Sequence, residues 1–260
     1  MLTEHECRSI AQDILNAEQS HIPIPQPSHT HSSMTLADAY RVQDFWVEAR
    51  VAKGARVVGH KIGLTSRAMQ MASKITEPDF GRILDDALYR DGAKIAAGTF
   101  LKPRLEVELA FIMADDLEGS NVQIYDVLRA TEFVVPALEI IDYRTQVPRA
   151  IVDTIADNAA FGAIVVGGRP VRPMDVDIRW VGATLSKNAT IEESGVSAAV
   201  MGHPAAGVAW LVNKLHLVGA KLEKGQIVLT GSFTRPVDIA SGDVIHADYG
   251  PLGAIAVSFE

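Results

Sequence analysis

The sequence contains a single cysteine, Cys7, so it cannot form an intrachain disulfide. It also lacks any apolar run of about 18 residues, the length that a transmembrane helix requires. Residues 1–20 carry four acidic residues and no long apolar core, so we expect no secretory leader. These absences predict a soluble, cytoplasmic protein that has no membrane partner.

The chain has little positive charge to offer to a polyanion. Its 24 Lys and Arg residues face 32 Asp and Glu residues, which gives a formal net charge of −8. Nucleic-acid binding needs a basic patch, so we expect no nucleic-acid partner. The sequence also lacks a GxGxxG fingerprint, a P-loop, a GxSxG nucleophile elbow and an HExxH zinc motif.

Helical patterns dominate the N-terminal part, and short strands dominate the remainder. A Thr3–Glu6 capping box opens one helix, and Thr35 caps a second helix that Gly54 ends. After this point the pattern changes to short strands and turns, apart from a few helices. We therefore predict an α+β protein with an N-terminal helical segment at 1–55 and a β-rich catalytic domain at 56–260.

A predicted strand at Arg104–Met113 carries two acidic residues on one face. Apolar residues alternate with Glu106 and Glu108, whose Cα atoms should lie about 6.5–7 Å apart. Glu139 stands near the end of another apolar run. Carboxylates on a buried face repel one another and lose hydration, and a hard cation would remove both costs. Three oxygen ligands favour Mg²⁺ or Mn²⁺ over Zn²⁺, but the spacing also suits the polar face of a half-exposed strand.

Lys61 lies between two glycines in an otherwise apolar strand. Its ammonium group could serve as an acid, a base or a carboxylate anchor, or it could simply be exposed at a strand end. We predict that Glu77–Gly81 is a turn-rich loop with a mobile tip, and that Arg144–Arg149 is a polar loop. We also predict a strand at Val176–Lys187. The hydroxyl and N–H groups of Gly231–Pro236 could hold a carboxylate.

Six segments of the chain together resemble a known family. They are Gly59–Ser66 (GHKIGLTS), the Glu106-x-Glu108 strand, Pro136–Glu139 (PALE), Asp157–Ala160 (DNAA), His203–Leu211 and Gly231–Pro236 (GSFTRP). In this order they resemble the 2-keto-4-pentenoate hydratase family within the fumarylacetoacetate hydrolase superfamily. The resemblance extends from about residue 35 to the last residue of the sequence.

The resemblance implies a mixed β-sandwich roll like the fumarylacetoacetate hydrolase C-terminal fold. It also implies assembly into a homo-oligomer, either a dimer or a ring of dimers. It places a Mg²⁺ or Mn²⁺ ion at Glu106, Glu108 and Glu139, and it makes Lys61 and Asp79 the acid–base groups beside the substrate.

Four further residues complete the predicted site. His60 is an alternative base, although a packed or hydrogen-bonded strand histidine explains it equally well. We expect Leu64, Ser232 and Thr234 to contact the substrate.

The activity that the resemblance implies is the hydration of a small 2-oxo-alkenoate in aromatic meta-cleavage catabolism. We expect the dicarboxylate 2-oxo-hept-4-ene-1,7-dioate, whose second carboxylate needs its own cation. Arg67, Arg82, Arg144 and Arg235 are the candidates for that anchor. The alternatives are a 2-oxo acid decarboxylase of the 4-oxalocrotonate type, an acylpyruvate hydrolase, and a ligand-binding member of the fold without enzymatic activity.

Overall fold

The structure is a computed structural model, and it describes residues 1–72 and 74–260. The helices are α1 Glu4–Ser20, α2 Pro27–Thr30, α3 Leu36–Ala52, α4 Arg67–Ala72, α5 Ile124–Ala130, α6 Ile151–Ala156 and α7 Pro204–His216. The strands are β1 Val57–Gly63, β2 Asp79–Leu84, β3 Leu88–Arg90, β4 Ala93–Ile95, β5 Arg104–Met113, β6 Thr131–Ile141, β7 Phe161–Val166, β8 Gly182–Lys187, β9 Thr190–Val196, β10 Ile227–Leu229, β11 Val237–Asp238, β12 Val244–Asp248 and β13 Ala254–Phe259.

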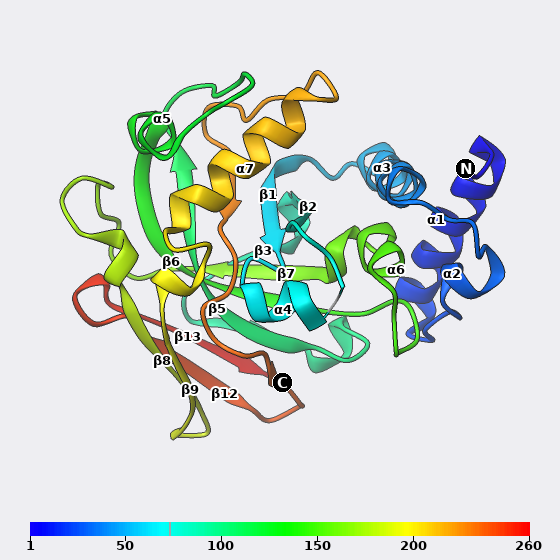
Figure 1. The fold of residues 1–260 in the computed structure, drawn as a ribbon. Helices are drawn as coiled ribbons and strands as arrows, with labels where there is room; N and C mark the ends of the chain where they lie inside the picture. The colour runs from blue at the N-terminus through cyan, green and yellow to red at the C-terminus, as the bar shows by residue number, and fades with distance from the viewer. Residues whose placement is uncertain (73) are drawn as a thin grey trace.

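Two mixed sheets form the body of the protein. The larger, 8-stranded sheet has the order β2-β1-β10-β5-β6-β7-β3, with β11 paired to β5. The 5-stranded sheet has the order β4-β13-β12-β8-β9. Most neighbours are antiparallel, but β1–β10, β3–β7 and β4–β13 are parallel pairs. Figure 1 shows the N-terminal helices and the smaller sheet at opposite ends of the molecule. The predicted α+β class is confirmed.

The long antiparallel pair β5–β6 lies in the middle of the larger sheet and separates the core from the site. Leu105, Val107, Leu109 and Phe111 of β5 are fully buried. They belong to one hydrophobic cluster with apolar residues of α7 and of the smaller sheet. Burying such a side chain contributes about 1.5–3 kcal/mol, which holds β5 in a single register. Since side chains alternate along a strand, the glutamates of β5 must all point to the opposite face.

The N-terminal helices pack on the body through a second hydrophobic cluster. Ile14 of α1 and Trp46 of α3 lie in it beside Leu84 of β2 and Ile155 of α6. Both predicted helix starts are confirmed, because capping boxes are present at Thr3–Glu6 and Thr35–Asp38. The division into 1–55 and 56–260 stays a prediction. None of the helices in the described part of the chain is both long and apolar enough to cross a bilayer.

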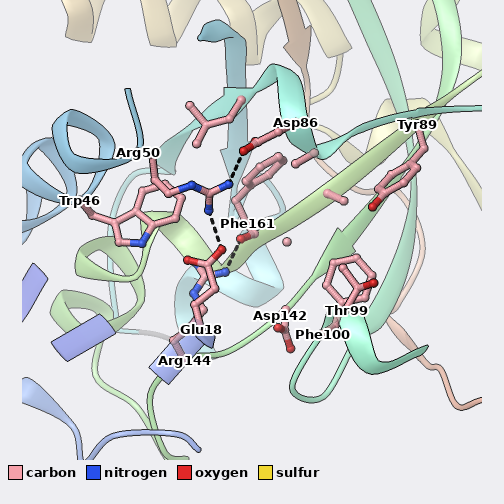
Figure 2. A pocket seen from close by; sticks show the side chains of 14 residues that line it. Glu18, Trp46, Arg50, Asp86, Tyr89, Thr99, Phe100, Asp142, Arg144 and Phe161 are labelled. Carbon is pink, nitrogen blue, oxygen red and sulfur yellow. Dashed lines mark hydrogen bonds and ion pairs between the residues drawn. The ribbon is translucent and has the colours of Figure 1, made fainter. Parts of the chain in front are cut away.

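Residues 144–149 lie outside the helices and strands, as the loop prediction expects, but the side chain of Arg144 is buried. Its side chain is 4% exposed, and its Nε donates to Asp157 Oδ1 at 2.5 Å while its Nη1 donates to the Phe161 carbonyl at 2.6 Å. Nearby, Arg50 bridges Glu18 and Asp86 across the seam between the helices and the sheet, as Figure 2 shows. Paired and hydrogen-bonded arginines can be buried where isolated charges cannot.

Two sequence predictions differ from the structure. The predicted loop Glu77–Gly81 becomes strand β2 from Asp79 onward, because this segment pairs with β1 and places Asp79 opposite Gly63. The predicted strand Val176–Lys187 is a strand only from Gly182, and a 3₁₀ turn at residues 178–180 precedes it. In the first case sheet pairing overrides local turn propensity.

Candidate active site

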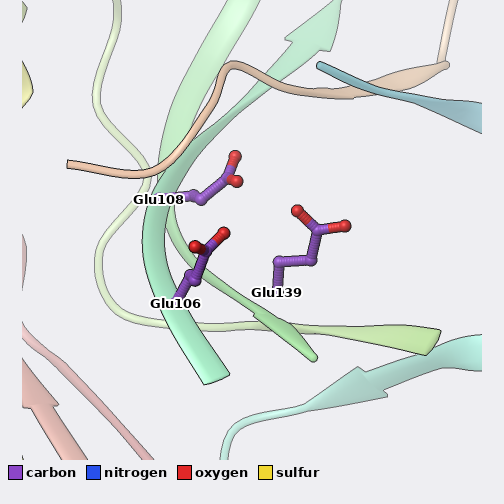
Figure 3. Close-up of side chains that lie close together, drawn as sticks. All are labelled: Glu106, Glu108 and Glu139. Carbon is purple, nitrogen blue, oxygen red and sulfur yellow. The ribbon is translucent and has the colours of Figure 1, made fainter. Parts of the chain in front are cut away.

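Three glutamates converge on one face of the β5–β6 pair. Glu106 lies directly opposite Glu139 in the strand register, and Glu108 follows two residues along the same face of β5. One carboxylate oxygen from each residue lies within 4.8 Å of those of the other two. Figure 3 shows the three carboxylates pointing toward a common space. The structure therefore brings together the three predicted metal ligands.

Burial of this acidic cluster is costly unless a cation compensates it. Glu108 and Glu139 are each 1% exposed. Burial and the nearby charge of Glu139 raise the pKa of Glu106 to about 7, and burial also raises the pKa of Glu108 and of Glu139. Oε1 of Glu139 is buried and has no hydrogen-bond partner among the residues that the structure describes. A mostly buried, oxygen-only cluster of this kind fits a hard divalent cation such as Mg²⁺ or Mn²⁺.

Lys61 is buried beside this cluster, so it is not an exposed strand-end lysine. Its Nζ lies 3.1 Å from Glu139 Oε1 and makes an ion pair, although the geometry is not that of a hydrogen bond. Burial alone would lower the pKa of Lys61, but the attraction of Glu139 and of the neighbouring carboxylates outweighs it and raises the pKa. In the metal-free protein Lys61 is therefore a protonated group, 4% exposed, at the acidic cluster.

Asp79 joins Lys61 because β2 pairs with β1. Asp79 is 2% exposed, and its Oδ1 is buried and makes no hydrogen bond within the described part of the chain. Gly63 lies between the two groups: a Cβ there would collide with Asp79 Oδ1 and would stand 3.3 Å from Lys61 Nζ. Burial raises the pKa of Asp79, and Lys61 and Arg149 oppose that rise. A glycine at position 63 thus allows an ammonium and a carboxyl group to approach each other.

The segment Gly231–Pro236, which follows β10, also contacts the site. The Gly231 N–H donates to Glu108 Oε2 at 2.8 Å, which holds this carboxylate in place. The Ser232 hydroxyl donates to the Thr234 carbonyl at 2.9 Å, and Thr234 Oγ1 accepts from the Val107 N–H at 3.2 Å. Both hydroxyl groups line the cavity but also anchor the segment to β5. Their substrate contacts stay a prediction, as do those of Leu64, which lines the same cavity.

His60 is placed differently from its neighbour Lys61. It alternates with Lys61 along β1 and is not among the residues that line the cavity. Its ring lies 6.5 Å from the ring of Phe80, centroid to centroid. Burial and the charge of Arg82 lower the pKa of His60 to about 3, so the imidazole is neutral at ordinary pH. This placement favours the packed strand histidine over the catalytic base.

One cavity of about 1210 Å³ holds the site. Its wall includes Lys61, Asp79, Glu106 and Glu108 together with residues from segments 141–154 and 193–199.

The four arginines predicted as candidates for the distal-carboxylate anchor differ in whether they reach this cavity. Among them only Arg235 lines the cavity, and its side chain is 84% exposed. Our four candidates did not include Arg149, although this residue lines the same cavity.

Comparison with protein-family models matches residues 51–259 of this chain to the fumarylacetoacetate (FAA) hydrolase C-terminal family. The chain belongs to this family. The match extends over both sheets and includes the three glutamates, Lys61 and Asp79.

Individual relatives agree with this family. The chain is 48% identical to 2-oxo-hept-4-ene-1,7-dioate hydratase of Escherichia coli, over 100% of both chains. It is 35% identical to 2-keto-4-pentenoate hydratase of Paraburkholderia xenovorans (strain LB400), over 100% of this chain and 97% of that one. The solved structure of 4-oxalocrotonate decarboxylase from Pseudomonas putida G7, complexed with magnesium and adipate, matches with a TM-score of 0.98 and 32% identity, over 100% and 99% of the two chains.

The raised pKa of Glu106 predicts that Mg²⁺ stabilises the protein more at about pH 8 than at about pH 5.5. In the metal-free protein this carboxyl group has a pKa of about 7, above its ordinary 4.5, so folding stability is lost as the pH rises through that interval. Above pH 7 a bound cation offsets the free-energy cost of the ionised Glu106 carboxylate. At lower pH the cation must first displace the proton from this carboxyl group, so it stabilises the protein less. Thermal unfolding with Mg²⁺ and with EDTA at both pH values measures the difference. Equal shifts at both values would contradict the prediction.

Proposed function

We propose that the protein is a metal-dependent hydratase that adds water to 2-oxo-hept-4-ene-1,7-dioate and gives a 4-hydroxy-2-oxo acid in aromatic meta-cleavage catabolism. The observation that carries the proposal is the cluster of Glu106, Glu108 and Glu139 with Lys61 and Asp79, of which all but Glu106 are buried and all but Glu139 line one cavity. The full-length similarity to the Escherichia coli dioate hydratase supports the choice of substrate. A scaffold without activity would gain nothing from burying these charges.

The proposed reaction moves a double bond and then adds water. A proton leaves carbon 3 and another is delivered to carbon 5, so the double bond becomes conjugated with the 2-oxo group. The oxygen of water then bonds to carbon 4, and a proton returns to carbon 3. When bound, a divalent cation at the three glutamates would hold the 2-oxo acid end and stabilise negative charge on the keto oxygen.

In this proposal Lys61 and Asp79 move the protons. Lys61 is protonated in the metal-free protein and can donate from Nζ, while the buried carboxyl group of Asp79 has a raised pKa that suits proton exchange. Their approach across Gly63 allows a proton removed by one group to be returned by the other.

A decarboxylase is the second candidate, because the Pseudomonas putida G7 decarboxylase has nearly the same fold over the whole chain. Stabilising negative charge on a keto oxygen also assists the loss of CO₂ from a vinylogous 2-oxo acid. An acylpyruvate hydrolase would need a base that activates water for C–C cleavage. His60, placed away from the cavity wall, does not suit that role.

Product identification distinguishes these activities. Purified protein with Mg²⁺ is incubated with 2-oxo-hept-4-ene-1,7-dioate, with 2-oxopent-4-enoate and with 4-oxalocrotonate, and the products are identified by NMR and mass spectrometry. A mass gain of one water, with a hydroxyl at carbon 4, supports the hydratase. Release of CO₂ as the dominant reaction would replace this proposal with the decarboxylase. We also propose a homo-oligomer, which light scattering can test.

A further inference from the structure

The cationic side chains around the cavity are not equivalent. Arg104 lies 3.0 Å from Asp238, and Arg235 lies 2.6 Å from Glu193. Both therefore have a carboxylate partner within the protein. Arg149 lines the same cavity on the segment that follows β6, and its side chain, 10% exposed, is the least exposed of the three.

We propose that Arg149 binds the distal carboxylate of a dicarboxylic 2-oxo acid and so selects dicarboxylates over monocarboxylates. This inference rests on the proposed function, because it assigns the end of the substrate that lies away from the metal ligands. It makes Arg149 a specificity-determining residue, whereas the chemistry stays with Lys61 and Asp79.

The hydrogen bonds around Arg149 leave one of its donors free. Its Nη1 is buried and has no hydrogen-bond partner among the described residues. The closest carboxylate oxygen, Asp157 Oδ2, is 3.8 Å from Nη1, which is beyond hydrogen-bond distance. That same oxygen already accepts from the Arg144 N–H at 2.8 Å, and Oδ1 accepts from Arg144 Nε. Both carboxylate oxygens of Asp157 therefore already accept hydrogen bonds from Arg144.

The carboxylates nearest to Arg149 make their hydrogen bonds with other groups of the protein. Arg144 and Arg149 both lie beside Asp157, whose two oxygens accept from Arg144. The other nearby carboxylate, Asp153, accepts from the backbone and hydroxyl of Ser28 and from the Ala150 N–H. Burial lowers the pKa of Arg149, which shows that its charge is desolvated, but a guanidinium stays protonated in proteins. A carboxylate ligand would give this guanidinium a hydrogen-bonded partner.

The surroundings of Arg149 suit one end of an aliphatic diacid. Its guanidinium carbon lies 3.6 Å from the centroid of the Tyr143 ring, and this stacking fixes the plane of the donors. A fixed, planar guanidinium can bind a carboxylate through two parallel hydrogen bonds. Ile141, Pro148 and Ile151 line the same cavity and offer apolar contacts for the methylene carbons. One ligand can thus meet the glutamates and Arg149 within a single cavity.

The test compares ligands that differ only at the distal end. 2-Oxoheptane-1,7-dioate and 2-oxoheptanoate have the same chain length, and neither has a double bond to hydrate. Their binding to Mg²⁺-loaded wild type and Arg149→Met is measured by calorimetry. We expect the variant to bind the dioate about 10- to 100-fold more weakly, the usual effect of a charge-assisted hydrogen bond, and to bind the monocarboxylate almost as wild type does.

Two further variants control the experiment. Arg235→Met removes an exposed arginine of the same cavity and should leave the preference for the dioate unchanged. Arg149→Lys keeps the positive charge but cannot form two parallel hydrogen bonds to a carboxylate, so it should retain part of the preference for the dioate. If Arg149→Met does not fold, the lysine variant takes its place in the comparison. Thermal unfolding of each variant monitors the fold.

Equal weakening of both ligands would show that Arg149 only supports the loop, and unchanged binding of both would show that it does not contact the distal carboxylate. Either result overturns the inference while leaving the hydratase proposal intact. Conversely, a wild-type protein that hydrates neither alkenoate would refute the hydratase. The calorimetric comparison would still decide the role of Arg149, because it needs no turnover.

Discussion

Glu106→Gln or Glu139→Gln is expected to abolish Mg²⁺ binding and turnover while the fold stays intact. Each substitution keeps the shape of the side chain but removes one of three carboxylates that converge within 4.8 Å. Loss of a group that merely orients a metal ligand lowers affinity about 10- to 100-fold, so loss of a ligand should cost at least about 100-fold. Calorimetric titration with Mg²⁺ and an assay of dioate hydration measure the two effects.

Glu193→Gln is the matched control, because Glu193 lines the same cavity but lies outside the metal-ligand cluster. It should bind Mg²⁺ as wild type does. In the absence of metal, the Glu106 variant should unfold at the wild-type temperature or above it, since it removes a charge that its neighbours repel. The Glu139 variant also loses the ion pair with Lys61, so it should unfold at a lower temperature than the Glu106 variant. Wild-type Mg²⁺ affinity in either variant would remove that residue from the metal site.

Lys61→Ala is expected to lower kcat by about 10²–10⁴-fold, the usual contribution of a positioned acid–base group. The ammonium group is buried at the acidic cluster and close to Asp79, where it can deliver protons to the substrate. Mg²⁺ affinity should not fall, because the substitution removes a positive charge that competes with the cation for Glu139. Steady-state kinetics and metal titration on the same preparation separate the two properties.

Lys61→Met tests whether the charge or the packing of the side chain matters. It retains most of the buried volume and should lose as much activity as the alanine variant. Lys74→Met, at an exposed lysine of the same cavity, should keep nearly the wild-type kcat. A decrease of less than about threefold for Lys61→Ala, far below the acid–base range, would refute the assignment.

Local patterns in the sequence were sufficient for the parts of the protein that depend on residues close together in the chain. Thr3 and Thr35 each precede an acidic residue at the third helical position, and both capping boxes form as predicted. The alternation along Arg104–Met113 places Glu106 and Glu108 on one face, because successive side chains on a strand must point in opposite directions. The choice of Mg²⁺ or Mn²⁺ likewise follows from the chemistry of carboxylate ligands.

Local patterns could not predict which groups come together when distant segments of the chain pair. The segment around Asp79 contains the turn-forming residues of a loop, but its pairing with β1 makes it a buried strand beside Lys61. His60 and Lys61 are adjacent in sequence, and the sheet decides which of them faces the cavity. Arg144 and Arg149 look alike in one polar segment. Asp157 pairs closely with the first and leaves the second with a donor that has no partner among the described residues, because contacts across the fold decide where a charged side chain finds its partner.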